Sequence, residues 1–249
     1  MSKLPQITVY FWIMKICATT LGETGGDLLS MTLNVGYGLS SLILISFFLI
    51  ALISQLFAKK YHPFLYWAVI LATSTAGTTM SDYMDRTLGL GYAKGSLILV
   101  TILMIIFAFW HFSSESLSVN TIKTFKVEFI YWTAILFSNT LGTAFGDFLA
   151  DSSGLGFAGG ALLIASLLGI VLLCHFYTKI SKTLLFWIAF VLTRPLGATV
   201  GDFFTKVPAK GGLGFGTIGS SVILATGLIG FILYTMKQRK TLVSVLGNI

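Results

Sequence analysis

Eight long apolar runs, separated by short polar segments, make up most of the chain. They cover residues 8–31, 36–58, 64–84, 92–112, 128–150, 156–178, 183–205 and 213–236. Each run is about long enough to cross the roughly 30 Å hydrocarbon core of a bilayer as a helix. The first run lacks a small-residue cleavage site, so we expect it to remain in the mature protein. The pattern predicts an all-α membrane protein with eight transmembrane helices.

One motif occurs four times along these runs. It ends in an aspartate, with a glycine five residues earlier, a tryptophan fifteen residues earlier and a glycine-aromatic pair downstream. The motif reads TTLGETGGD at 19–27, STAGTTMSD at 74–82, NTLGTAFGD at 139–147 and RPLGATVGD at 194–202. The other landmarks are Gly22, Gly77, Gly142 and Gly197; Trp12, Trp67, Trp132 and Trp187; and Gly36-Tyr37, Gly91-Tyr92, Gly156-Phe157 and Gly214-Phe215. Four landmarks that agree in four places indicate an internal repeat.

The spacing of the four aspartates indicates how the repeats are organised. Successive aspartates lie 55, 65 and 55 residues apart, as expected for a helix hairpin duplicated twice. Each repeat holds two crossings, so all four repeats are parallel and related by an axis along the membrane normal. We expect a pseudo-fourfold bundle, or two pseudo-twofold halves. Residues 1–112 form repeats 1 and 2, residues 113–127 a cytoplasmic linker and residues 128–249 repeats 3 and 4, all within one integral membrane domain.

Composition and charge agree with this picture and add an orientation. Hydrophobic residues make up 55% of the chain and charged residues only 10%, against roughly 25% charged in soluble domains, which excludes a cytosolic enzyme and a disordered chain. Ten Lys and Arg residues fall on the side of the termini and four on the other side, which are Arg86, Lys94, Lys206 and Lys210. The positive-inside rule then places both termini in the cytoplasm. The four tryptophans are expected at the cytoplasmic interface.

Polar residues form a stripe on each odd-numbered run. Positions four and eight residues before each aspartate share its helical face, and they hold Glu23, Thr78, Thr143 and Ala198, and Thr19, Ser74, Asn139 and Arg194. Adjoining positions hold Thr20, Thr24, Thr75, Thr79, Thr140 and Thr199. A carboxylate at mid-bilayer costs at least about 2.5–3.5 kcal/mol. We therefore expect the stripes to face one another or a watery cavity and to line a pathway.

The acids on these stripes predict a cation site. Like charges that converge cannot all remain ionised without a counter-charge, so the site should take up protons or a metal ion. Oxygen ligands suit Mn²⁺, Mg²⁺ or Ca²⁺, and the three histidines, His62, His111 and His175, lie away from the stripe. The predicted ligands are Asp27, Asp82, Asp147, Asp202 and Glu23. No covalent cofactor is expected, only a bound divalent cation.

A structural interpretation of the same residues stays open. The repeated glycines could allow close helix packing, and the acids could pair with Lys15 or Arg194 instead of binding a cation. Arg194 and Asp202, two turns apart in one helix, are expected to form an internal ion pair. Lys15 is expected to snorkel toward the cytoplasm. The glycine-rich segments after each aspartate are expected to be tight turns with helix starts rather than phosphate loops.

Two resemblances follow from these motifs. TTLGETGGD, TTMSDYMDRTLGLGY, LGTAFGD with the following GLGF, and TRPLGATVGDF resemble a family of bacterial multi-pass inner-membrane proteins without a characterised activity. More distantly, GETGGD is similar to the E-x-G-D-[KR]-[ST] signature of small Ca²⁺ and Mn²⁺ exchangers. In this sequence an extra glycine separates the acids, and no basic residue follows the aspartate. The second resemblance implies a shared cation chemistry rather than homology.

Three classes of function remain to be compared. The first hypothesis is a transporter or channel for a divalent cation, with proton coupling as an option and the aspartates forming the site. The second is a membrane scaffold or sensor subunit in which the acids are structural. The third is an intramembrane enzyme, which is disfavoured because the G-x-G-D setting of membrane aspartyl proteases is absent, so we expect no enzyme activity. The expected partners are the lipid bilayer and inorganic cations or protons. The scattered basic residues argue against nucleic acid, and a homo-oligomer is left open.

Overall fold

The computed structural model describes residues 4–113, 117–119, 122 and 124–246, and in this part of the chain all regular structure is helical. The α-helices are α1 (Val9–Asp27), α2 (Tyr37–Phe57), α3 (Pro63–Asp82), α4 (Tyr92–Ser113), α5 (Phe125–Asp147), α6 (Gly156–Tyr177), α7 (Lys182–Thr205) and α8 (Gly216–Leu246). Short π-helical turns follow three of them: η1 (Leu28–Thr32), η2 (Tyr83–Thr87) and η4 (Phe148–Ser152). A single 3₁₀ turn, η5 (Pro208–Lys210), precedes α8. The prediction of eight helices and no strand is confirmed for the described residues.

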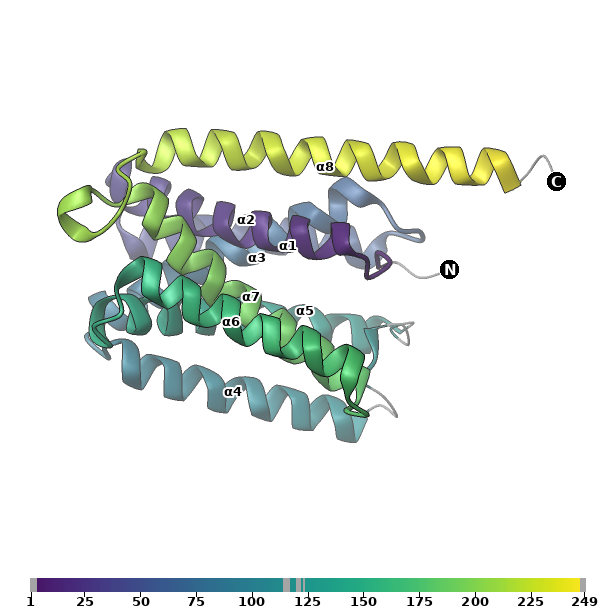
Figure 1. The fold of residues 1–249 in the computed structure, drawn as a ribbon, viewed down its shortest axis with the longest axis horizontal. Coiled ribbons are helices and arrows are strands. Elements are labelled where there is room, and N and C mark those ends of the chain that lie inside the picture. Colours follow the sequence, from purple (N-terminus) through teal and green to yellow (C-terminus); the bar gives the residue numbers. More distant parts are fainter. Residues whose placement is uncertain (1–3, 114–116, 120–121, 123, 247–249) are drawn as a thin grey trace.

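The helices form two concentric layers. The odd-numbered helices pack in a closed ring, α1 on α3, α3 on α5, α5 on α7 and α7 on α1. Each even-numbered helix packs outside this ring on the odd helix of the next repeat, so α2 lies on α3, α4 on α5, α6 on α7 and α8 on α1. The contact of α8 with α1 joins the last repeat to the first and completes a pseudo-fourfold pattern. Figure 1 shows the helices side by side along the long axis.

Local sequence signals explain where the helices begin. Thr8, Thr124 and Ser181 cap α1, α5 and α7 by accepting a hydrogen bond from a backbone N–H three residues later, and Pro63 opens α3. The even helices instead follow or begin at glycines with φ between 67° and 80°, which are Gly36, Gly91, Gly156 and Gly216. Left-handed backbone favours glycine. The predicted turns and helix starts are therefore confirmed, although α8 begins at Gly216, directly after the Gly214-Phe215 pair.

The outer helices present apolar side chains to the surroundings. Leu42, Leu97, Leu162 and Ile223, one from each outer helix, are 65–70% exposed. Such a continuous apolar exterior is typical of a surface in contact with lipid. Five helices, α2, α4, α6, α7 and α8, are long and apolar enough to cross a membrane, which is the character of a multi-pass membrane protein. α1, α3 and α5 are more polar because they carry the stripes and lie inside the outer layer.

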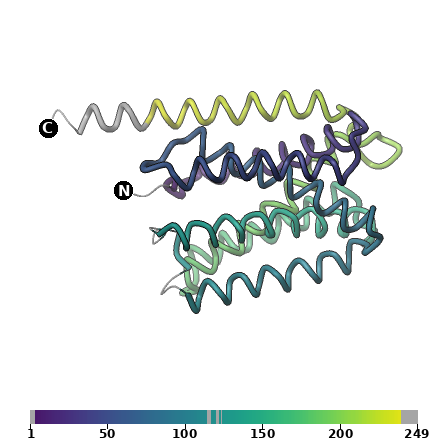
Figure 2. The backbone as a smooth tube through the Cα atoms, turned by 180° about the vertical axis from the view of Figure 1, so that it is seen from behind, coloured from purple at the N-terminus to yellow at the C-terminus, as the bar shows by residue number. Residues whose placement is uncertain are grey.

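Both chain ends lie at one end of the bundle, and the turns that follow the aspartates lie at the other (Figure 1). The same arrangement is seen from behind in Figure 2. Parts of the predicted linker at residues 113–127 lie outside the described residues. Of the rest, Ile122 is buried in the core, and the Leu117 carbonyl accepts a hydrogen bond from Trp187 Nε1 at 3.0 Å. The linker therefore lies against the terminal end of the bundle.

Candidate cation site

The four repeat aspartates lie at or near the ends of the inner helices. Asp27, Asp82 and Asp147 are the last α-helical residues of α1, α3 and α5, and a π-helical turn follows each of them directly. Asp202 lies near the end of α7, which continues as α-helix to Thr205. All four residues are buried, with exposures of 1–3%. Because π-helical turns interrupt the regular backbone ladder, they are frequent at functional sites.

The repeated glycines bring neighbouring inner helices into backbone contact. A Cβ at Gly77 would lie 2.9 Å from the backbone nitrogen of Thr140, so α3 and α5 touch at this point without an intervening side chain. The same register sets Gly22 against Ser74, Gly142 against Arg194 and Gly197 against Thr19. Each glycine thus faces the stripe position eight residues before the aspartate of the next repeat. This close approach holds the polar stripes of adjacent helices together around the ring.

Arg86 joins two of the aspartates. Its Nε lies 2.8 Å from Asp82 Oδ1, and its Nη2 donates to Asp147 Oδ2 at 3.1 Å. Its guanidinium carbon also lies 6.0 Å from the centroid of the Tyr37 ring and 5.6 Å from that of the Tyr92 ring. These tyrosines belong to the glycine-aromatic pairs of repeats 1 and 2. The repeat landmarks therefore meet at this basic side chain.

Lys206 joins the other two aspartates. Its Nζ donates to Asp27 Oδ2 at 2.5 Å and lies 2.9 Å from Asp202 Oδ1. The Arg86 side chain is 30% exposed and the Lys206 side chain 19% exposed, whereas the acids that they contact are buried. The two bases thus cover the aspartates on the side that faces the turns.

These two bases lie in predicted loops and were therefore not among the predicted site residues. Each stands four residues after its own aspartate, a spacing that favours an ion pair in a helix. Repeats 1 and 3 carry Met31 and Asp151 at this position. The fourfold helix ring therefore holds a twofold pattern of charge, and the i, i+4 spacing was the signal that could have revealed it.

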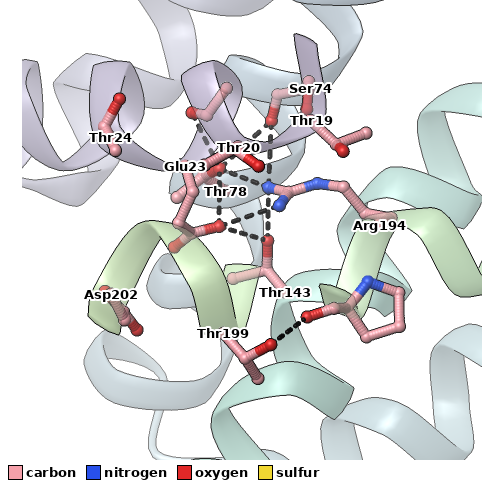
Figure 3. A network of polar contacts seen from close by, with 12 residues as sticks. Thr19, Thr20, Glu23, Thr24, Ser74, Thr78, Thr143, Arg194, Thr199 and Asp202 are labelled. Atoms are coloured by element: carbon pink, nitrogen blue, oxygen red, sulfur yellow. Dashed lines mark hydrogen bonds and ion pairs between the residues drawn. The ribbon is translucent and has the colours of Figure 1, made fainter. Parts of the chain in front are cut away.

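One layer deeper, Arg194 and Glu23 form the centre of a polar network (Figure 3). Arg194 Nη1 donates to Glu23 Oε2 at 2.9 Å. Arg194 Nη2 donates to Thr78 Oγ1 at 2.5 Å, to Thr143 Oγ1 at 2.7 Å and to the Ser74 carbonyl at 3.3 Å. Both threonine hydroxyls donate in turn to Glu23 Oε2 at 3.3 Å. One side chain of α7 thus bonds to α1, α3 and α5.

The predicted ion pair between Arg194 and Asp202 is wrong. The Arg194 side chain is fully buried and pairs with Glu23 of the neighbouring helix α1, while Asp202 contacts Lys206. The aliphatic part of the Arg194 side chain packs against Gly142 of α5, where a larger residue would clash with it. A buried guanidinium needs a carboxylate partner, and Glu23 of the neighbouring helix provides it.

Three acids converge at the centre of the cluster. Glu23, Asp147 and Asp202 are all buried, and each offers a carboxylate oxygen that lies within 4.8 Å of the other two. Asp27 and Asp82 join this group through Lys206 and Arg86, as described above. All five predicted ligand residues are therefore linked in one cluster, but only three bring their oxygens close enough to share one ion.

The cluster carries more negative than positive charge. Five acids, Glu23, Asp27, Asp82, Asp147 and Asp202, contact three bases, Arg86, Arg194 and Lys206. Full ionisation would therefore leave a formal charge of −2. Buried charge without a counter-ion is costly. One divalent cation or two protons would balance the cluster.

The remaining stripe residues fall into two groups. Thr19 and Asn139 link neighbouring inner helices, because Thr19 Oγ1 donates to the Thr193 carbonyl at 3.1 Å and Asn139 Nδ2 to Thr73 Oγ1 at 2.9 Å. A second group of hydroxyls donates to carbonyls of their own helices: Thr20, Thr24, Thr75, Thr79, Thr140 and Thr199. This bonding satisfies a hydroxyl in apolar surroundings. None of these six hydroxyls takes part in the described hydrogen bonds of the Arg194 network.

The predicted snorkelling of Lys15 is also wrong. Lys15 is fully buried in α1, and its Nζ lies 4.1 Å from the centroid of the Phe190 ring. The amine has no hydrogen-bond partner among the described residues. α1 belongs to the inner ring, so its side chain extends toward α7 rather than along the lipid boundary.

The tryptophans of the repeats lie mostly inside the bundle rather than on its outer surface. Trp67, Trp132 and Trp187 are 0–5% exposed, and only Trp12 is partly exposed. They pack edge-on or tilted against other aromatic rings such as Tyr66 and Tyr131. The inner helices meet at these rings, which offer more contact area than a lipid interface would. This aromatic layer fills the terminal end of the bundle.

The fold and the site together indicate an all-helical protein with four repeats, multi-pass membrane character and a buried cluster of acids. A family model matches all four repeats, at residues 10–61, 65–116, 130–181 and 185–241. The chain therefore belongs to the family described as Repeat of Unknown Function (DUF347). No curated protein and no solved structure matches the chain.

Proposed function

We propose that this protein transports a divalent cation such as Mn²⁺, Mg²⁺ or Ca²⁺ across the bacterial inner membrane, in exchange for protons. The observation that carries the proposal is the group formed by Glu23, Asp147 and Asp202, whose oxygens lie within 4.8 Å of one another. Hard divalent cations prefer such oxygen ligands. The formal charge of −2 on the surrounding cluster equals the charge that one such ion, or two protons, would neutralise.

The proposal includes eight membrane crossings with both termini in the cytoplasm. The closed ring of α1, α3, α5 and α7 lies within the outer helices, so polar inner helices can cross a bilayer while contacting little lipid. Polar side chains in a membrane usually face the interior of a bundle. The excess of basic residues at the terminal end supports the cytoplasmic assignment.

A carrier is favoured over a channel. Arg194 contacts all three other inner helices at the centre of the ring, and the aromatic layer fills the bundle beyond it. A buried guanidinium on the axis would oppose the passage of a free cation. A site closed toward the cytoplasm and covered by two partly exposed bases on the other side suits alternating access.

The similarity of GETGGD to the exchanger signature supports the same chemistry. The glutamate of this segment, Glu23, belongs to the group of three acids, and its aspartate, Asp27, contacts Lys206. The similarity to the exchanger signature is limited to these two acidic residues.

Flux measurements in proteoliposomes test the proposed function. The purified protein should carry Mn²⁺ into vesicles at a rate that depends on the pH gradient, and the D147N/D202N variant should reduce this flux to that of protein-free vesicles. Asp151→Asn is the matched control, because this exposed acid contacts Tyr92 rather than the cluster. Absence of flux in the native protein for Mn²⁺, Mg²⁺ and Ca²⁺ alike would overturn the proposal.

A membrane scaffold or sensor subunit is the second candidate. It is favoured by the Arg194 network, in which one side chain ties four helices together and every acid of the cluster has a basic partner. This candidate predicts that the native protein neither binds nor moves the three cations. We propose no enzymatic activity for either candidate.

A further inference from the structure

Each acid of the proposed cation site already holds a basic side chain. Arg194 Nη1 lies 2.9 Å from Glu23, Arg86 Nη2 3.1 Å from Asp147 and Lys206 Nζ 2.9 Å from Asp202. A metal ion that used these three acids as ligands would compete with three cations of the protein itself. Whether a metal ion can bind therefore depends on whether it can displace these basic side chains from the carboxylates.

Lys206 has a second acid outside the proposed site. It donates a hydrogen bond to Asp27 Oδ2 at 2.5 Å, whereas Asp202 Oδ1, at 2.9 Å, has no hydrogen-bond partner of good geometry among the described residues. The contact with Asp27 is thus the better formed of the two. Lys206 could release Asp202 and remain paired with Asp27.

Arg86 also bridges a site acid and a second acid, but here the contact with the site acid is the better formed, because Asp82 Oδ1 has no hydrogen-bond partner of good geometry among the described residues. Its Nη2 contacts Asp147, which belongs to the proposed site, while its Nε lies 2.8 Å from Asp82, which does not. The two acids bind different nitrogens of the guanidinium, so loss of one contact leaves the other in place. Both bases are partly exposed, which gives their side chains room to shift.

The second partners, Asp27 and Asp82, lower the free-energy cost of displacing Lys206 and Arg86 by a metal ion. Removing the partner of a buried ion pair is strongly destabilising, because the remaining charge is left uncompensated. A base with only one acid would therefore resist displacement. A base with two acids keeps one partner while the other acid binds a metal ion.

We propose that Asp27 and Asp82 are holding acids rather than metal ligands. In the structure Lys206 and Arg86 bridge the holding acids and the site acids. When a cation binds to Glu23, Asp147 and Asp202, Lys206 stays with Asp27 and Arg86 stays with Asp82. Arg194, which has no second acid, keeps its hydrogen bond to Glu23 Oε2. This inference rests on the proposed function, because it takes the three acids as the site. It separates the four equivalent aspartates of the repeats into two ligands and two positioning residues.

Mn²⁺ titration of the purified full-length protein in detergent tests this division of roles. Lys206→Gln removes a competitor and should tighten Mn²⁺ binding. Asp27→Asn leaves Lys206 with Asp202 alone and should weaken binding by about tenfold or more, which a titration resolves easily. The D27N/K206Q double variant should regain at least native affinity, because the base that Asp27 held is gone. Lys210→Gln is the matched control, since Lys210 is exposed on the same end of the bundle.

The outcomes are separable. If Asp27 is a ligand, the D27N/K206Q variant stays as weak as D27N, and the inference is overturned. If neither single variant changes affinity, the inference is likewise overturned, although the proposed function stands. If the native protein binds no Mn²⁺, the proposed function itself fails. The D82N, R86Q and D82N/R86Q variants repeat the cycle at the second bridge, so poor folding of one variant leaves the inference testable.

Discussion

Lys15 is fully buried in α1, with its amine over the Phe190 ring and without a hydrogen-bond partner among the described residues. The aliphatic stem suits the apolar surroundings, but the amine loses the hydration that it has in water. A cation–π contact recovers only part of this energy. Lys15 therefore reduces the stability of the bundle in the state seen here.

Replacement of Lys15 by methionine should stabilise the protein. Methionine keeps the length of the stem and removes a buried polar group, whose burial without a partner costs about 1–3 kcal/mol. In a thermal melt of the purified protein, each kcal/mol should raise the melting temperature by about 2–4 °C. Lys94→Met, at an exposed position, should leave the melting temperature nearly unchanged. A fall in the melting temperature of K15M would contradict this account.

The positions of the acids could be predicted from the sequence, but only some of their partners could. The repeat spacing places Asp27, Asp82, Asp147 and Asp202 at one depth because equivalent residues of equivalent helices share a height. The i, i+4 spacing predicts the pairs of Arg86 with Asp82 and of Lys206 with Asp202, but not the second contact that each base makes with an aspartate of another repeat. The partner of Arg194 lies on the neighbouring inner helix α1, and spacing within one helix does not indicate which neighbour a long side chain reaches.

At the scale of the helices, the contact between α3 and α5 shows why small residues recur in the repeat. Gly77 faces the backbone of Asn139 and Thr140, so no side chain can fit between the two helices. Close backbone approach of this kind stabilises helix pairs in membranes through packing contacts. It also brings Thr78 and Thr143 within reach of the same guanidinium.

Alanine at two glycines of this protein should have opposite effects. The Cβ of Gly77→Ala would lie 2.9–3.0 Å from backbone atoms of α5, so α3 and α5 must separate at a cost of about 1–3 kcal/mol. Gly169 lies on the exposed face of α6 with no atom within 4 Å of a Cβ. There alanine should stabilise the helix by about 0.5–1 kcal/mol. Thermal melts of both variants measure the difference, and equal effects would show that the glycine contact is unimportant.

At the scale of the whole molecule, charge is distributed unevenly between the two ends of the bundle. Four basic residues belong to the end that carries the turns. Arg86 and Lys206 contact buried acids, and the other two are Lys94 and Lys210. The sequence assigns ten Lys and Arg residues to the opposite side. This excess is the asymmetry on which the positive-inside rule acts, and it favours the terminal end as cytoplasmic.

Thiol labelling in intact cells distinguishes eight crossings from five. Lys60 follows α2 and Lys94 lies in the first turn of α4, and both are exposed. If α3 crosses the membrane, a cysteine at position 94 should react with an impermeant reagent and one at position 60 should not, in a background without Cys17 and Cys174. If only the five most apolar helices cross, α3 does not, and both positions lie on one side. Equal labelling of the two cysteines would therefore refute the inner ring as a set of transmembrane helices, and with it a cation path between its acids.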